Sequence, residues 1–309
     1  MSDQWIRKAS LIVAGSSDGI DLSDLQFRFS VRNSDDEAPN NAYIRVYNLT
    51  QATVRKIVGK GEFTRVILQA GYQTGRFGVI FDGTVRQYAT GKENNVDSYL
   101  DIMAAHEDVP YTFGMVSQTL TAGSSALDRY QAITKQAGII ADKNAANTLT
   151  GGILPRGKVL WGMAKSQLRD IADSQSCRWS IQDGVAVMIP LTGYLPGEAV
   201  VLTSQTGLIG IPEANDGGIH AKCLLNPLIK IGQRVQIDNA SINQITNLSA
   251  VSYASRSSLS MPASVTNDGF YRVMVAEFSG DTRGEQWDTD LVCISIDSTA
   301  PAASSVNAQ

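Results

Sequence analysis

The sequence predicts an α+β protein that is predominantly antiparallel β, with β-rich segments on either side of a small mixed unit. In both terminal segments apolar and polar residues alternate over many short stretches, which is the pattern of half-buried strands. Glycine and asparagine turns separate these stretches at short intervals, as is typical of antiparallel sheets. Between the two segments, apolar residues at helical spacing predict helices. With 309 residues, of which 43% are hydrophobic, the chain is long enough for more than one domain.

The first segment is expected to hold five strands and one helix. Apolar residues at every second position from Leu25 to Val31 place one face of a strand in the core. Thr50 can cap a helix over residues 51–58, and Gly59 would end it. The other four strands show the same alternation and are expected at residues 43–48, 64–70, 79–87 and 98–105.

The middle segment is expected to contain two helices followed by a hairpin. Ser125 and Asp128 form a capping-box pattern at the start of the first helix, and Gly138 would end it. The second helix is predicted over residues 161–174. Asp183-Gly184, placed between two alternating runs, is the typical turn of a β-hairpin.

The last segment returns to the two-residue period. Residues 219–225 place apolar side chains on one face of a strand, and further strands are expected at 270–278 and 291–296. Residues 239–268 are rich in Ser, Asn and Ala and predict a long loop or peripheral hairpin. Residues 299–309 lack the apolar side chains needed for packing and predict a flexible tail.

Composition narrows the classes of function. Lys and Arg number 26 and Asp and Glu 30, so the net charge is −4, which argues against binding nucleic acid through phosphate neutralisation. Three cysteines, with no Cys-x-x-Cys pair, predict neither a disulfide framework nor a zinc ribbon. The longest apolar runs are too short for a signal peptide or a membrane span. We therefore expect a soluble protein that is synthesised in the cytoplasm.

The sequence predicts no catalytic site, no metal site and no cofactor. His220 and Cys223 fall on opposite faces of their strand, which disfavours a Cys–His dyad. His106-Glu107-Asp108 follows a strand, and adjacent side chains there point in opposite directions, so a solvated strand end is favoured over a metal site.

Four parts of the chain together carry a family resemblance. They are Pro39-Asn-Asn-Ala-Tyr-Ile-Arg-Val-Tyr-Asn-Leu-Thr50 followed by a short helix and Val66-Ile-Leu-Gln-Ala-Gly-Tyr72; Val79-Ile-Phe-Asp-Gly-Thr-Val-Arg86; Thr206-Gly-Leu-Ile-Gly-Ile-Pro212 leading to Cys223-Leu-Leu-Asn-Pro-Leu-Ile-Lys-Ile-Gly232; and Gly269-Phe-Tyr-Arg-Val-Met-Val275 with Ser279-Gly-Asp-Thr-Arg-Gly-Glu-Gln-Trp287 and Leu291-Val-Cys-Ile294. In their order and spacing they resemble the baseplate hub proteins of contractile-tailed bacteriophages and their prophage relatives, from about residue 20 to residue 297.

The resemblance implies a domain organisation and a set of partners. Residues 1–110 and 196–298 would be two β-barrel domains that imitate the tail-tube fold, 111–195 a small α+β domain and 299–309 a tail. Three subunits would form a quasi-sixfold ring in the virion baseplate, assembled in the host cytoplasm, between the tail tube protein and the central spike protein. Other baseplate proteins would be further partners, no membrane would be involved, and DNA would only pass through the channel. A net negative charge suits such a channel because acidic walls repel phosphate.

Within this family the polar loop Gly280-Asp-Thr-Arg-Gly284 is the candidate interface. It lies between apolar strand residues, and Arg283 could reach a carboxylate on a neighbouring subunit, with Asp281 and Trp287 beside it. A plain hairpin is the interpretation that the residues favour, and the interface is the alternative to it.

A different class of function also fits the composition. A β-rich, tail-associated protein that binds or cleaves glycans would need a groove of exposed aromatics or a converging pair of acids. Its candidate acids have no distinguishing context in the sequence: Asp82, Asp101, Asp281 and Asp290. Aromatic residues make up only 7% of the chain, which favours the structural hub.

Overall fold

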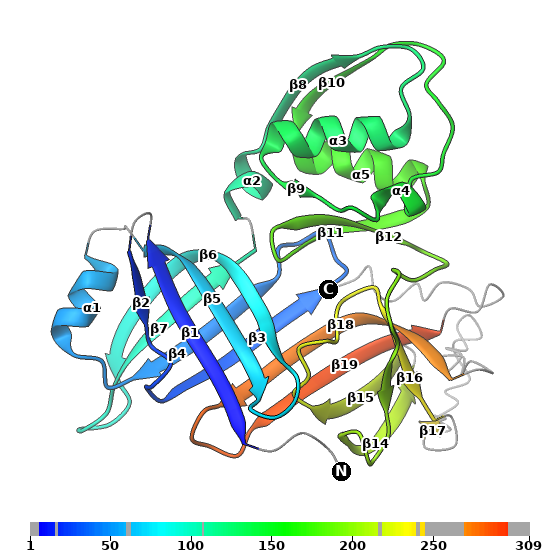
Figure 1. Cartoon of the computed structure of the whole chain (residues 1–309). Coiled ribbons are helices and arrows are strands. Elements are labelled where there is room, and N and C mark those ends of the chain that lie inside the picture. The colour runs from blue at the N-terminus through cyan, green and yellow to red at the C-terminus, as the bar shows by residue number, and fades with distance from the viewer. Residues whose placement is uncertain are drawn as a thin grey trace, which may run out of the picture.

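The structure is a computed structural model of the whole chain, and it describes residues 6–15, 18–59, 63–106, 108–215, 218–238, 242–244 and 269–295. One large, mostly antiparallel sheet forms the body, and a smaller α+β unit stands at one end of it (Figure 1). The α+β fold class with a predominance of antiparallel strands is therefore confirmed. No helix among the described residues is long and apolar enough to cross a membrane.

The elements fall into three groups along the chain. Those before the α+β unit are β1 (Arg7–Gly15), β2 (Gly19–Asp21), β3 (Phe27–Ser34), β4 (Asn41–Tyr47), α1 (Gln51–Val58), β5 (Phe63–Tyr72), β6 (Phe77–Lys92) and β7 (Ser98–Ala105). The α+β unit contains α2 (Asp108–Phe113), β8 (Met115–Leu120), α3 (Ala126–Ala137), β9 (Ile140–Ala141), α4 (Ala145–Thr148), β10 (Lys158–Met163), α5 (Ala164–Ser174), β11 (Cys177–Gln182) and β12 (Val185–Pro190). The rest are β13 (Val200–Leu202), β14 (Leu208–Asn215), β15 (Gly218–Leu224), β16 (Arg234–Ile237), β17 (Asn243–Gln244), β18 (Phe270–Asp281) and β19 (Trp287–Ser295).

The large sheet runs without a break through both terminal segments. Its strand order is β17-β14-β15-β19-β18-β3-β4-β7-β6-β5-β1-β2, with β16 paired to both β18 and β13. Among the described residues this path has open ends at β2 and β17, so no barrel closes through backbone pairing. The expected pair of closed barrels is thus not observed; instead, the edge strands β3 and β18 join the two segments.

Each terminal segment contributes five strands in the same arrangement. In the N-terminal half (β3 to β7) the spatial order is β3-β4-β7-β6-β5, and in the C-terminal half (β14 to β19 without β17) it is β14-β15-β19-β18-β16. When the five strands of each half are numbered along the chain, they lie side by side in the order first, second, fifth, fourth, third. Every neighbouring pair is antiparallel. Both halves also carry a one-residue irregularity at the same place, between Val85 and Gln87 of β6 and between Val273 and Val275 of β18.

The seam between the halves is a regular antiparallel ladder. It runs from the pair Ser34↔Val275 to the pair Arg28↔Asp281. A single hydrophobic cluster extends across this seam, from Leu11 in β1 to Cys293 in β19. Backbone pairing and a shared core therefore hold the two halves together as one body.

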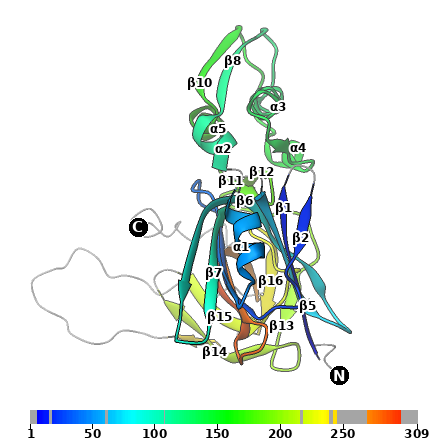
Figure 2. The same ribbon diagram turned by 90° about the vertical axis from the view of Figure 1, so that its left-hand side faces the viewer.

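The α+β unit has a separate hydrophobic core, formed by residues between Val116 and Met188. Figure 2 shows this unit standing clear of the sheet, with the β11–β12 hairpin nearest the sheet. The predicted capping box is confirmed: the Ser125 side chain accepts from the Asp128 N–H, and the Asp128 carboxylate accepts from the Ser125 N–H. Gly138 ends α3 in the left-handed conformation, at φ 74°.

The second predicted helix begins later than expected. Residues 161–163 belong to β10, which pairs with β8, and α5 starts only at Ala164. In β10 the side chain of Leu160 is buried while Val159 and Trp161 are exposed, so a two-residue period precedes the helical one. The apolar positions of the two periods overlap at this boundary, and this overlap explains the error.

The remaining expectations have mixed outcomes. The capped helix at 51–58, the strand at 98–105 and the hairpin around Asp183-Gly184 are confirmed. Strands β1, β2, β8, β9, β10, β13 and β14 were not expected. The segment 239–268 lies outside the described residues apart from 242–244, and so does the expected tail at 299–309.

Candidate functional site

The three residues singled out by sequence meet at the β18–β19 hairpin, at the end of the sheet away from the α+β unit (Figure 1). The Asp281 carboxylate accepts from Arg28 Nε at 2.7 Å and from the Arg283 backbone N–H at 2.9 Å. Burial alone would raise the pKa of Asp281, but these hydrogen bonds hold it below its usual value. Asp281 thus closes its own loop and ties it to β3.

Trp287 also supports the loop from inside. Its side chain is buried and meets the ring of Phe29 edge-on, with 5.5 Å between centroids. The Arg7 guanidinium lies 5.6 Å from the centre of the Trp287 ring and donates to the carbonyl oxygens of Gly284 and Glu285. The hairpin is therefore held by contacts to both β1 and β3.

Arg283 differs from its two neighbours because its side chain is exposed at the tip of the hairpin. Within the described part of the chain no ion pair to Arg283 is formed. Of the three candidate residues, it is the one whose charged group faces outward on a rigidly supported loop.

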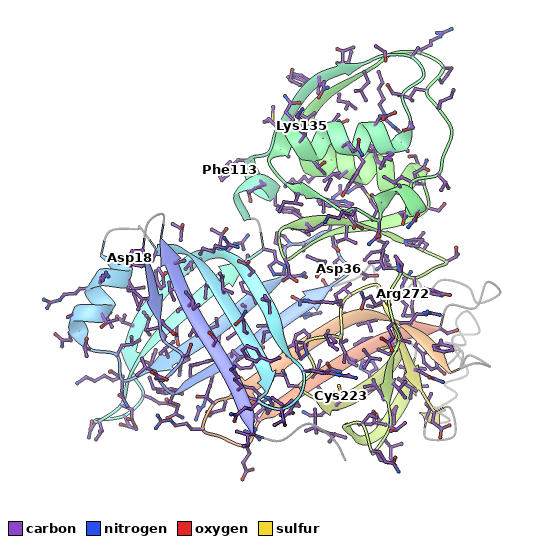
Figure 3. The ribbon with its side chains drawn as sticks, in the orientation of Figure 1. Asp18, Asp36, Phe113, Lys135, Cys223 and Arg272 are labelled. Carbon is purple, nitrogen blue, oxygen red and sulfur yellow. The ribbon has the colours of Figure 1, made fainter. Side chains whose placement is uncertain are left out.

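A second polar cluster, which the sequence did not indicate, joins the two halves of the sheet to the α+β unit. Asp35, in the β3–β4 loop, is 1% exposed, and its carboxylate lies 3.1 Å from Arg178 of β11 and 3.8 Å from Arg272 of β18. Arg272, itself 2% exposed, also donates to the carbonyl oxygens of Leu191 and Gly193 at 3.1 Å. Figure 3 shows Arg272 beneath the β11–β12 hairpin, together with Asp36, the residue that follows Asp35 in the sequence.

Desolvation dominates the electrostatics of this cluster. Burial raises the pKa of Asp35 although Arg178 and Arg272 lower it, and burial lowers the pKa of Arg272. A charge pair in such a place is costly to break, because the remaining charge would be buried without a partner. The cluster therefore fixes the α+β unit to the seam.

His106, at the end of β7, belongs to the same junction. The expectation of a solvated strand end is wrong at this residue: the imidazole is fully buried and stacks on Phe81, with 4.6 Å between ring centres. Its Nε2 faces Asp183 Oδ1 at 3.5 Å, its Nδ1 lies 3.4 Å from Asn40 Nδ2, and Asp183 in turn accepts from Lys230 Nζ at 3.0 Å. Burial lowers the pKa of His106 despite the nearby carboxylate of Asp183.

The groups around the ring nitrogens come from several elements. His106 Nδ1 also lies 3.3 Å from the carbonyl oxygen of Ile181 in β11, and Asn40 Nδ2 donates to that same oxygen at 3.2 Å. Asn40 and Asp183 come from the β3–β4 loop and the β11–β12 hairpin, and Lys230 comes from the C-terminal half. Four distant stretches of sequence thus meet at one imidazole, which is why no local pattern revealed the site.

The candidate residues for metal binding and Cys–His chemistry can also be placed in the structure. The described residues contain no group of three or more His, Cys, Asp or Glu side chains that could hold a metal ion. His220 is exposed while Cys223 is buried on the other face of β15, as expected from the alternation. A shallow hollow between β8 and α3 is lined mainly by polar side chains, and its carboxylate, Asp128, is used by the helix cap.

Comparison with known proteins identifies the chain by family and by fold. A search of curated protein sequences finds no match. Among solved structures, the 43 kDa tail protein of prophage MuSo2 from Shewanella oneidensis aligns over 94% of this chain and 97% of its own, with TM-score 0.57 and 7% identity. The tail protein from Neisseria meningitidis MC58 aligns over 94% and 96%, with TM-score 0.56 and 10% identity.

A third structure extends the fold beyond phage tails. It is the E. coli c3393 protein, a component of the type VI secretion system, which aligns over 88% of this chain and 74% of its own with TM-score 0.51 and 7% identity. At these identities the structures are evidence for the fold alone. The model of the family described as baseplate hub gp41 matches residues 11–255, most of the chain. The chain therefore belongs to the baseplate hub gp41 family.

Proposed function

We propose that this protein is the structural, non-enzymatic hub of a contractile phage tail, a homotrimer whose ring joins the tail tube to the central spike. Family membership carries the proposal. In it, each subunit offers two tube-like units side by side, so that three subunits match a sixfold tube. The α+β unit stands outside the ring, where it is free to meet other baseplate proteins.

The repeated strand order supports the two equivalent units. A sixfold partner can seat on three subunits only if each offers two similar docking surfaces. Both halves have the same five antiparallel strands in the same order, with an irregularity at the same step.

An ion pair recurs at the same position of both halves. Arg45 of β4 lies 2.7 Å from Asp101 of β7, and Lys222 of β15 lies 3.5 Å from Asp290 of β19, besides a shorter contact of 3.0 Å to Asp288. Both pairs join the second strand of a half to the fifth. Asp101 lies three positions before Ala104, the partner of Val85, and Asp290 lies three positions before Cys293, the partner of Val273. This recurrence supports a duplicated unit whose side chains have otherwise diverged.

We further propose that the β18–β19 hairpin is an interface of the assembled ring, with Arg283 as its charged contact. Asp281 and Trp287 hold the hairpin rigid, so an ion pair from Arg283 to a partner carboxylate would need little ordering.

Mass photometry of the purified chain, alone and with its tube and spike proteins, tests the assembly. We expect a species of three subunits, and negative-stain images of it should show a ring with six similar lobes. A chain that remains monomeric and binds neither partner would refute the proposal.

A further inference from the structure

The two halves of the sheet differ at one edge, although their strand order is the same. On the edge of β18 that faces away from β19, β16 pairs with residues 270–272 and β3 pairs with residues 275–281. On the corresponding edge of β6, β5 pairs as far as Thr84. From Gln87 to Lys92 no strand in the described part of the chain pairs with that edge, which we call the open β6 edge.

Burial follows this difference. Counted from the shared irregularity, Tyr88 and Thr90 of β6 correspond to Ala276 and Phe278 of β18. Ala276 and Phe278 are 1% and 2% exposed under the seam, whereas Tyr88 is only half-buried and Thr90 is exposed. An uncovered strand edge presents unpaired N–H and C=O groups and is a template for another chain.

The second edge with few backbone partners is the outer edge of β14, the edge that faces away from β15. β14 occupies in the C-terminal half the place that β3 occupies in the N-terminal half, and β3 is the strand that covers β18. On the outer edge of β14 only Glu213 and Ala214 are paired, by β17, among the described residues. Ile209 and Ile211 are 39% and 68% exposed there, beside an irregularity in the β14–β15 pairing.

We infer that the open β6 edge of one subunit is the docking surface for the outer β14 edge of a second copy of this chain. The inference rests on the proposed trimer and specifies its subunit contact. The seam inside each subunit, β3 against β18, is the template: repeated between copies, the same contact is head-to-tail and closes a ring of three. Ile209 and Ile211 supply apolar area to it, and the irregularity of β14 limits backbone pairing there.

The template also predicts which residues meet. Across the N-terminal half, Arg28 of β3 is the backbone partner of Arg45 in β4, and Arg45 is the partner of Asp101 in β7. Across the C-terminal half, Ile209 of β14 is the partner of Lys222 in β15, and Lys222 is the partner of Asp290 in β19. Ile209 thus corresponds to Arg28, whose partner at the seam is Asp281. Since Glu93 corresponds to Asp281 in the β6–β7 hairpin, Ile209 of one copy should lie next to Glu93 of the next.

Disulfide trapping tests this contact in the full-length chain. The double variant Glu93→Cys with Ile209→Cys should form covalent dimers and trimers under mild oxidation, whereas each single variant should not. The three native cysteines are buried, which keeps the background low. Trimers of the wild-type chain without cross-linking of the double variant would overturn the contact and leave the proposed trimer intact.

A surface substitution gives an independent readout. Ile211→Asp should weaken trimerisation at least about tenfold without changing the melting temperature, because it places a charge in the apolar contact. Ile153→Asp is the matched control, since Ile153 is 69% exposed on the α+β unit. Equal trimer populations for both variants would refute the contact, and a wild-type chain that stays monomeric with its partners present would refute the trimer itself.

Discussion

Replacing the buried His106 by Gln should change how the stability of the protein depends on pH. Burial lowers the folded-state pKa of His106 from its ordinary 6.5, so the unfolded chain takes up a proton at higher pH than the folded one. Stability is then complete above pH 6.5 and falls as the pH drops below it, by up to about 1.4 kcal/mol per pH unit. Between pH 7.5 and 5.5 a ring that stays neutral when folded loses about 1.4 kcal/mol in total.

The direction of the pKa shift of His106 is the balance of desolvation and of the charged groups around the ring. Asp183 and Asp82 favour the charged imidazole, whereas Lys230 and desolvation oppose it, and desolvation is the largest influence. His106→Gln removes the titrating group, so the stability advantage of the wild-type protein over the variant should shrink on acidification.

The assay is denaturant unfolding at pH 7.5, 6.5 and 5.5. His220→Gln is the matched control, because His220 is the only other histidine and lies on an exposed face. The protection factors of amides in the β11–β12 hairpin, corrected for the intrinsic exchange rate at each pH, should fall on acidification in the wild-type protein and change less in His106→Gln. A difference between wild type and His106→Gln that is constant or grows from pH 7.5 to 5.5 would refute the neutral, buried imidazole.

Three further substitutions test the seam, the junction and the hairpin. Phe278→Ala should lower the free energy of unfolding by about 3–5 kcal/mol, measured by denaturant titration, because it leaves a cavity beneath β3. Asp35→Ala should cost about 3–5 kcal/mol by the same measurement, since it leaves the buried Arg272 without a carboxylate and Arg178 with Asp36 alone at 3.9 Å; a cost below about 1 kcal/mol would contradict the account of the junction. Arg283→Glu should leave the melting temperature unchanged and weaken assembly with the baseplate partners by pull-down, whereas the exposed control Arg156→Glu should not.

Local signals in the sequence predicted the elements whose cause is local. The cap at Thr50, the capping box at Ser125 and the alternation that defines β7 each act within a few residues, and each is found where expected. β1 was missed because its apolar centre, Leu11 to Ala14, is a short continuous run without alternation. Its strand character comes from pairing with β5, which is distant in sequence.

The polar junction could not be predicted for a similar reason. Asp35, Arg178 and Arg272 meet only because the β3–β4 loop, β11 and β18 converge beneath the α+β unit. A single signal was present in the sequence: Arg272 interrupts a strand in which every other residue from Phe270 to Ala276 is apolar, so both faces are expected to be buried and the charge must find a partner. The hairpin residues, in contrast, were singled out in the sequence by their polar loop and flanking aromatic residue, and their interface role stays a prediction.

The lack of a visible sequence repeat between the two halves follows from what each half has to bury. Strand order and register depend on which positions are apolar, so two halves can share a topology with few identical residues. Where the surroundings differ, the side chains differ too: Phe278 is covered by β3, while Thr90 at the same position of β6 is exposed. Had both edges been covered within one chain, both positions would have favoured large apolar residues. In the proposed trimer the exposed Thr90 leaves a polar side chain on the open β6 edge, and the apolar contribution to the contact comes instead from Ile209 and Ile211 of the neighbouring copy.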